Sequence, residues 1–258
     1  MIVDTHAHLY YDDLLKNIDE ILKRAEDAGI EKIIAPAVDY KTSMQLLELC
    51  AKYPMIYAAL GIHPTDVNKY EYSELEKIEK LFDNKISMDK VVGVGETGLD
   101  YYWDTSYNDK QKEFFRLHIE IAKAKELPVI IHTRNSIDDA IQVVKDNYSE
   151  KLKGQFHCFD GTTEQLDKVM ALNTFYVSFT GNVTYKKYAY AETVAKVPMD
   201  RILSETDSPF LSPLPHRGKP NEPSYIVNTI KKIAEFKNVT EEEMKKSFRD
   251  NVKTLFKI

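Results

Sequence analysis

The chain has 258 residues, of which 43% are hydrophobic, and this is enough to bury the core of one large domain. Its formal net charge of -6 argues against a protein that grips long stretches of nucleic-acid backbone, because such binding depends on neutralising many phosphates. No apolar run approaches the roughly 18 residues needed to span a bilayer, and the N-terminal stretch is acidic where a secretory signal would be basic. We therefore expect a cytoplasmic protein without a membrane partner.

Neither cysteines nor linkers indicate a division of the chain. Cys50 and Cys158 lie far apart and form no C-x-x-C pair, so neither a disulfide framework nor a thiolate zinc site is expected. No low-complexity tract, linker rich in Pro, Gly or Ser, or repeated motif interrupts the sequence. We expect a single domain over residues 1–258 and a monomer.

Short runs rich in β-branched residues alternate with segments of helical period along the whole chain. The eight predicted strands cover residues 2–9, 32–38, 56–64, 91–102, 127–134, 154–159, 175–181 and 201–209. Strands that alternate with helices favour parallel pairing, and eight such units in this length predict a closed (β/α)8 TIM barrel. A doubly wound open sheet is the alternative, which is disfavoured because no G-x-G-x-x-G turn follows any strand.

Three features define the expected helices. Apolar residues at helical spacing predict one amphipathic helix over residues 14–25, with Gly29 as its C-terminal stop. Capping boxes are expected at Ser73 with Glu76, at Thr162 with Gln165 and at Thr240 with Glu243. The last box introduces a helix whose apolar stripe, Met244, Phe248, Val252 and Leu255 or Phe256, is interpreted as a packing surface.

The ionisable residues of the predicted strands fall at strand ends. They are His6, His8, His63, Glu96, His132, His157 and Asp207. In a barrel these ends converge on the face that carries catalysis, where these imidazoles and the two carboxylates would form a mixed nitrogen and oxygen metal site, and potentially a two-metal site. A single His at a strand end is more often a hydrogen-bonded structural residue, but burying several of these groups together without a cation would be costly. His118 lacks such neighbours and is expected to be structural, whereas His216 is left open.

The motifs, taken in order, are similar to those of a known family. They are "DTHAHL", "GIHP", "GETGLDYY", "IHTRNS", "HCFDG", "ETDSPFL", "RGKPNEP" and "NVKTLF". The chain resembles the TatD-type metal-dependent hydrolases, a branch of the amidohydrolase barrels often described as deoxyribonucleases. The resemblance implies one metal on His6, His8 and Asp207, a second on His132 and His157, and Glu96 bridging the two. It also implies a supporting or substrate-facing role for His63 and Glu205.

Two divalent ions, with Zn, Mn, Mg, Co and Ni as candidates, would activate water and clamp the oxygens of a phosphoryl group. Asp207 is the expected proton acceptor, with Glu205 as the alternative. Arg134 and Arg217 are candidates for binding the phosphate, although each could instead pair with an acid at the rim. Aromatic residues near the predicted mouth, Tyr101, Tyr102, Trp103, Phe159 and Phe210, could stack bases, while packing is the commoner role of such residues.

The sequence therefore predicts a metal-dependent deoxyribonuclease that shortens the ends of single-stranded DNA. The alternative enzyme is an ester or amide hydrolase, such as a deacylase of aminoacyl-tRNA or of a small metabolite, because the same activated water can attack a carbonyl carbon. A non-catalytic metal-binding barrel is a third hypothesis, and the intact ligand set counts against it.

Overall fold

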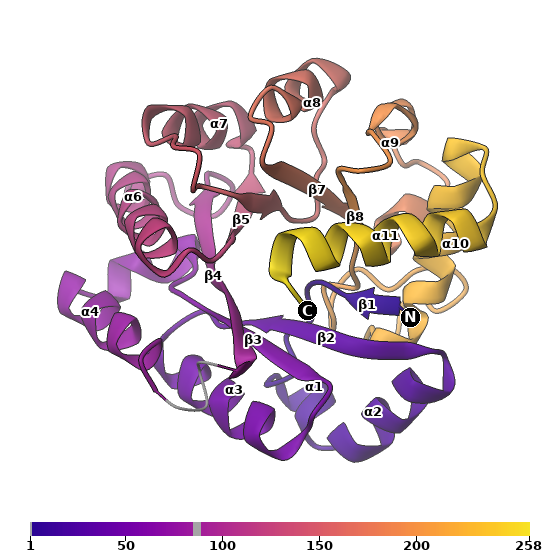
Figure 1. The fold of residues 1–258 in the computed structure, drawn as a ribbon, viewed down its shortest axis with the longest axis horizontal. Coiled ribbons are helices and arrows are strands. Elements are labelled where there is room, and N and C mark those ends of the chain that lie inside the picture. The colour runs from indigo at the N-terminus through magenta and orange to yellow at the C-terminus, as the bar shows by residue number, and fades with distance from the viewer. Residues whose placement is uncertain (1, 85–88) are drawn as a thin grey trace.

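Eight parallel strands follow one another in chain order around a central axis (Figure 1). The computed structural model describes residues 2–84 and 89–258. The strands are β1 (Ile2–Asp4), β2 (Ile30–Pro36), β3 (Ile56–Leu60), β4 (Val91–Asp100), β5 (Val129–Arg134), β6 (Gly154–Phe156), β7 (Phe175–Phe179) and β8 (Ile202–Ser204). Sequential parallel pairing from β1 to β8 confirms the predicted TIM barrel, formed as a single domain, and excludes the doubly wound alternative.

The barrel is closed between β8 and β1 by a few contacts beyond the ends of the two strands. Ala7 and Ser208 form one isolated parallel bridge. The carboxylate of Asp4 is fully buried and accepts hydrogen bonds from the backbone and hydroxyl of Thr206, at 3.0 and 2.6 Å. The closure therefore depends on a few hydrogen bonds at the carboxyl ends of β1 and β8 and in the segments that follow them, and these segments also carry candidate metal ligands.

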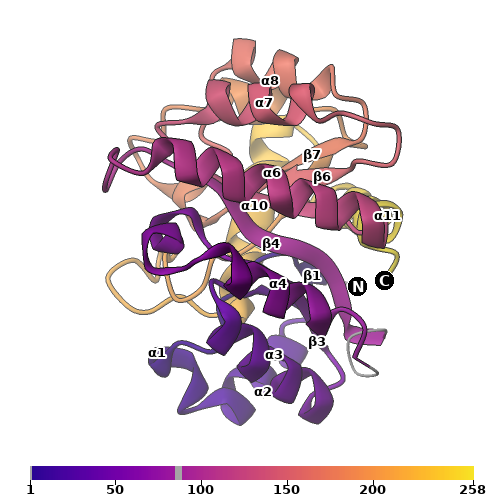
Figure 2. The same cartoon turned by 90° about the vertical axis from the view of Figure 1, so that its left-hand side faces the viewer.

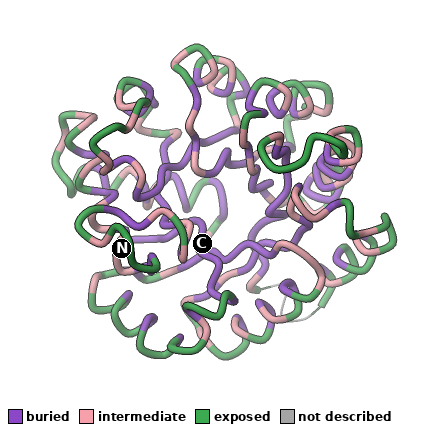
Figure 3. The backbone as a smooth tube through the Cα atoms, turned by 180° about the vertical axis from the view of Figure 1, so that it is seen from behind, coloured by how far each residue is buried: buried purple, intermediate pink, exposed green. Residues whose placement is uncertain are grey.

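Helices cover the outside of the strands, as the side view shows for α6 over β4 (Figure 2). The α-helices are α1 (Asp12–Leu15), α2 (Ile18–Asp27), α3 (Tyr40–Lys52), α4 (Tyr72–Leu81), α6 (Asn108–Lys125), α7 (Ile137–Asp146), α8 (Thr163–Met170), α9 (Ala191–Lys196), α10 (Ile226–Lys237) and α11 (Glu241–Phe256). Short 3-10 helices are η1 (Pro64–Lys69), η2 (Gly181–Thr184) and η3 (Pro223–Tyr225). The tube in Figure 3 is buried along the central strands and exposed mainly on the outer helices, as expected for a barrel with a filled centre.

The last helix, α11, closes one end of the barrel. Val252, Leu255 and Phe256 pack against a layer of apolar residues that comes from seven strands, namely Val3, Ile34, Ala59, Val92, Ile130, Tyr176 and Leu203. The helix begins at a capping box between Thr240 and Glu243, and its stripe is buried. Both features confirm the prediction of a packing helix. The open mouth lies at the opposite end, where the strands finish.

Two local predictions were wrong. The helix expected over residues 14–25 is two helices, because the chain breaks between α1 and α2 at Lys16 and Asn17. The box expected at Ser73 does not form, since α4 begins two residues earlier after Glu71 and has no side-chain cap. The boxes at Thr162 and Thr240 are present. Among the described residues, no helix combines the length and apolar character needed to cross a membrane.

Candidate metal centre

Glu96 reaches the centre of the barrel because β4 bulges at this point. The pairing of β4 with β5 shifts register between Val94 and Thr97, where β4 has an extra residue, and such bulges redirect side chains. Gly95 permits the close approach: its φ is +141°, and a Cβ there would lie 2.7 Å from the carbonyl oxygen of Ile130. The side chain of Glu96 is consequently almost fully buried.

A first group of ligand atoms faces one oxygen of Glu96. Oε2 lies 3.3 Å from Nε2 of His6 and 3.5 Å from Nε2 of His8. Oδ1 of Asp207 lies 3.6 and 3.4 Å from the same two nitrogens. Backbone bonds at the barrel closure fix the positions, because the Asp207 amide donates to the carbonyl of His6 and the His8 amide donates to Ser208, each at 2.8 Å. Four side chains therefore converge on one small volume.

A second group faces the other oxygen of Glu96. Oε1 lies 3.0 Å from Nδ1 of His132 and 2.9 Å from Nε2 of His157. These two nitrogens are 3.3 Å apart. Nε2 of His63 also lies 3.4 Å from Oε1, and Thr65 holds the other ring nitrogen of His63 at 2.7 Å. The structure therefore brings His63 to the second group, where it can face either an ion or a substrate.

The spacing of these atoms fits divalent ions. Donor atoms bound at 2.0–2.2 Å to one tetrahedral ion lie about 3.3–3.6 Å apart, and the separations in the first group are 3.2–3.6 Å. Oε2 of Glu96 is buried without a hydrogen-bond partner among the described residues, a costly arrangement unless a cation compensates it. Burial alone would raise the pKa of Glu96, but His157, His63 and His6 outweigh it and lower the pKa well below its usual value. The carboxylate is therefore ionised and available for a metal.

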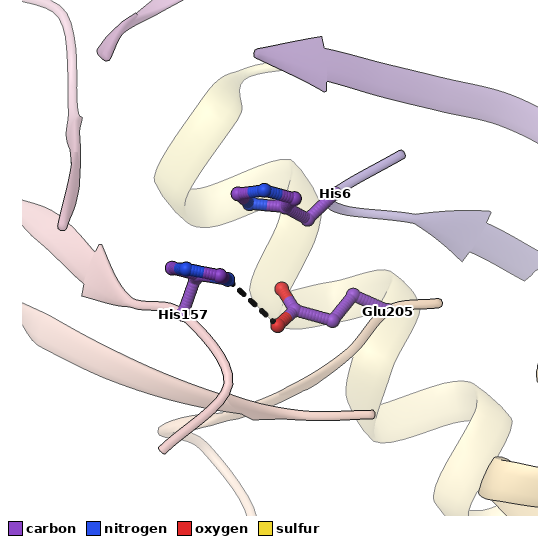
Figure 4. A group of neighbouring side chains, drawn as sticks. All are labelled: His6, His157 and Glu205. Atoms are coloured by element: carbon purple, nitrogen blue, oxygen red, sulfur yellow. Dashed lines mark hydrogen bonds and ion pairs between the residues drawn. The ribbon is translucent and has the colours of Figure 1, made fainter. Parts of the chain in front are cut away.

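Buried carboxylates hold His132 and His157 of the second group. Oδ2 of Asp100 lies 2.9 Å from Nε2 of His132, which leaves Nδ1 directed at Glu96. Oε1 of Glu205 lies 3.3 Å from Nδ1 of His157 (Figure 4). A carboxylate on the far nitrogen of a ligating imidazole fixes its orientation and raises its basicity. These contacts are typical of supports for metal ligands.

Glu205 is fully engaged in that support. Its Oε1 also accepts a bond of 2.6 Å from the amide of Cys158, and its Oε2 accepts bonds of 2.8 and 2.7 Å from Gln155 and Ser178. Figure 4 shows its carboxylate directed at His157, with His6 beside them. Glu205 was predicted as an alternative proton acceptor, but these contacts favour a positioning role.

Sequence reasoning missed two of the supporting residues. Asp100 lies at the end of β4, four residues after Glu96 and within the motif "GETGLDYY". Its position at a strand end was the signal that could have identified it. The hydroxyl of Tyr10 lies 2.8 Å from Nδ1 of His8, and its place two residues after His8 offered a weaker signal.

A cavity of about 610 Å³ opens above the two groups. Candidate ligands from both groups line it together with Arg134, namely His8, Glu96, His132, His157 and Asp207, whereas His6 is not among the lining residues. The guanidinium of Arg134 lies 3.7 Å from the ring centre of Tyr102. Arg217 is exposed, lies over the ring of Tyr185 at 4.4 Å and is not among the lining residues. The structure therefore places one of the two predicted phosphate-binding arginines in the cavity.

The remaining histidines lie in structural settings. His118 accepts a bond from the amide of Ile62 and contacts the carbonyl of Phe114, and burial lowers its pKa to about 4. His216 stacks on Tyr225 with ring centres 3.7 Å apart.

The motif "RGKPNEP" anchors the loop that follows β8. Asn221 donates to the carbonyls of Thr206 and Phe210, at 2.8 and 2.7 Å. Glu222 accepts two bonds from Arg24 of α2, at 2.8 and 2.7 Å. This part of the motif fixes the loop to the barrel.

An eight-stranded parallel barrel with histidines and carboxylates converging at the carboxyl ends of its strands defines a metal-dependent hydrolase. The family model described as TatD related DNase matches residues 3–257. The chain belongs to the TatD family, as the motifs predicted.

Named relatives agree with this class. The uncharacterized metal-dependent hydrolase YabD of Bacillus subtilis is 41% identical over 259 residues, covering 100% of both chains. The uncharacterized metal-dependent hydrolase YcfH of Escherichia coli is 33% identical, covering 100% of this chain and 96% of the relative. The crystal structure of YjjV, a TatD homolog from Escherichia coli, matches with a TM-score of 0.94 at 29% identity, covering 100% of this chain and 98% of that one.

Proposed function

We propose that this hydrolase is a phosphodiesterase that shortens single-stranded DNA from a free end with the help of two divalent ions. One observation carries the two-ion arrangement: the two oxygens of Glu96 face separate groups of ligand atoms. Two ions held there would supply an activated water and clamp the oxygens around the reacting phosphorus. The native metal is one of Zn, Mn, Mg, Co and Ni, since imidazoles suit transition metals and carboxylates also suit Mg.

The chain's own residues have separate roles in this proposal. Asp207 accepts the proton of the attacking water, because its carboxylate lines the cavity beside both histidines of the first group. Burial would raise the pKa of Asp207, but the bond from His8 and the neighbouring His6 and His157 lower it, so the carboxylate is ionised near neutral pH. Arg134 binds the non-bridging oxygens of the phosphate from the cavity wall.

DNA is favoured over an ester or amide by three features. The family model is described as a DNase family. Arg134 provides a cavity guanidinium suited to phosphate. A strand end also fits a pocket whose far side is closed by α11, and an acidic chain is better suited to few phosphate contacts than to long tracts.

The test is to remove metals with a chelator, restore each candidate ion separately, and count bound ions per chain. Each form is assayed on an end-labelled linear strand and on a covalently closed circle of the same sequence. We expect two ions per chain and rapid release of nucleotides from the linear strand only. Cleavage of the circle would contradict the requirement for an end. Release of carboxylic acid from esters or amides with intact DNA would favour the alternative hydrolase.

A further inference from the structure

Exposed aromatic rings lie on two sides of the mouth. Tyr11 and Phe210 follow β1 and β8, whereas Tyr102 and Trp103 follow β4. In an eight-stranded barrel with sequential order, β4 lies across the barrel from β8. The two pairs therefore follow strands on opposite sides of the barrel, and Tyr11, Phe210 and Trp103 all line the cavity above the ligand groups.

The first pair adjoins the first ligand group. Tyr11 and Phe210 are 38% and 47% exposed, and their rings meet edge to face at 5.6 Å. Both rings also approach the ring of His8, at 5.6 and 6.1 Å. Both residues line the cavity. This apolar surface is therefore continuous with the polar centre, where a substrate must lie.

The second pair is fixed relative to the second ligand group. Tyr102 and Trp103 are 53% and 69% exposed. Their amides donate to Oδ1 of Asp100, at 2.9 and 3.4 Å, while Oδ2 of the same carboxylate holds His132. Arg134 covers the ring of Tyr102 at 3.7 Å and lies 5.3 Å from that of Trp103. The guanidinium that we propose as a phosphate ligand is therefore next to a largely uncovered indole.

Two ring surfaces on either side of a phosphate-binding centre match a ligand with a ring on each side of its phosphate. We propose, on the basis of the proposed phosphodiesterase function, that the mouth contains two nucleobase subsites. Tyr11 with Phe210 stacks the base on one side of the scissile phosphate, and Trp103 stacks the base on the other side. Every base has a π-face, so stacking of this kind binds single strands with little sequence preference. The substrate class is thus an unpaired dinucleotide unit at a strand end.

Trp103 allows a direct binding test because it is the only tryptophan of the chain. Wild-type protein loaded with metal is titrated with deoxyadenosine 5'-monophosphate and, separately, with 2-deoxyribose 5-phosphate, which carries the same phosphate without a base. We expect the nucleotide to quench the tryptophan fluorescence and to bind about tenfold more tightly than the sugar phosphate. Equal affinity without quenching would overturn the subsite at Trp103.

Phe210→Ala tests the second subsite, with Tyr148→Ala as the control. Tyr148 is 42% exposed and lies just beyond the C-terminal end of α7, so its removal leaves the mouth unchanged. On dinucleotides we expect Phe210→Ala to raise KM about tenfold with little change in kcat, and Tyr148→Ala to change neither. A dinucleotide that lacks the base at this subsite should be a poor substrate for wild type and should lose nothing further in Phe210→Ala. The same KM increase on both substrates would show that Phe210 is merely structural.

The outcomes separate this inference from the proposed function. Hydrolysis of base-free and normal dinucleotides with equal efficiency would overturn the subsites and leave the phosphodiesterase intact. Base-dependent quenching of Trp103 fluorescence, with no hydrolysis of dinucleotides by the protein loaded with any of the candidate ions, would support the subsites and overturn the phosphodiesterase function.

Discussion

The two halves of the metal centre are held in different ways. The first group, His6, His8 and Asp207, is positioned by backbone hydrogen bonds across the closure between β8 and β1. The second group is positioned through side chains, since the carboxylates of Asp100 and Glu205 hold His132 and His157. In the first group Nδ1 of His6 has no hydrogen-bond partner among the described residues. The far nitrogen of His8 is held by the neutral hydroxyl of Tyr10 instead of a carboxylate.

This difference has an electrostatic consequence. Burial, followed by the neighbouring His157, lowers the pKa of His6. Burial would also lower the pKa of His157, but Glu96 and Glu205 outweigh it and raise that pKa well above its usual value. The pKa of His132 is likewise raised, because Asp100 and Glu96 outweigh burial. The pKa of histidine is therefore lowered at His6 on one side of Glu96 and raised at His132 and His157 on the other side.

Removing the link between the halves should have the largest effect. Glu96→Gln replaces a carboxylate that faces both groups with an amide, which has only one oxygen for a metal. We expect both ions to bind more weakly and turnover to fall by more than the roughly 10- to 100-fold typical of losing a supporting residue. Counting bound ions by elemental analysis, together with steady-state rates, is the measurement. Wild-type rate with two tightly bound ions would exclude the bridging role.

Loss of a carboxylate support should affect one half selectively. Glu205→Gln removes the charge behind His157, and we expect one of two metal-binding steps to weaken about 10- to 100-fold while the other is retained. Ser178→Ala is the matched control, because it removes a donor to Glu205 without touching His157. Calorimetric metal titration distinguishes the steps, and thermal unfolding of the metal-free variants reveals any general loss of stability. Equal weakening of both steps would mean that the halves are not independently supported.

As the pH is lowered, the second ligand group should lose its metal ion before the first group does. Ligating imidazoles must be neutral, and a raised pKa means that protons compete with metal at a higher pH. Since the pKa values of His132 and His157 are raised and that of His6 is lowered, the second group should lose its ion earlier as pH falls from about 8 to about 5.5. NMR of the histidine rings during a pH titration of the metal-loaded protein identifies which rings are released. Earlier release of His6 would contradict the assignment.

The hydroxyl behind His8 should have the smallest effect. Tyr10→Phe removes a neutral hydrogen bond and keeps the buried ring, so the expected cost in metal binding is about 0.5–1.5 kcal/mol. The effect should be confined to the first group and be clearly smaller than that of Glu205→Gln. Metal titration of both variants under identical conditions provides the comparison. A larger loss in Tyr10→Phe would reverse the proposed order of the two supports.

The barrel and the convergence of its polar strand ends could be predicted because both follow from local patterns. Buried strand runs alternate with helices, and parallel strands bring their carboxyl ends together. The resemblance already implied a supporting role for Glu205, whereas Asp100 was missed, because it faces His132 only through the path of β4 beyond its bulge. The break between α1 and α2 was also missed, since apolar spacing continues across Lys16 and Asn17 although the backbone does not. These details depend on tertiary geometry, which the periodicity of apolar residues in the sequence does not reveal.

Helix α11, which closes the far end of the barrel, also determines by which side a substrate enters and a product leaves. Val252, Leu255 and Phe256 fill that end, so the cavity opens on the side of the mouth and is closed on the side of α11. A polymer cannot pass through a cavity that is closed at its far end. If the proposed activity on strand ends holds, each released fragment would leave through the mouth by which the strand entered, so we expect the enzyme to dissociate from the strand between cleavages.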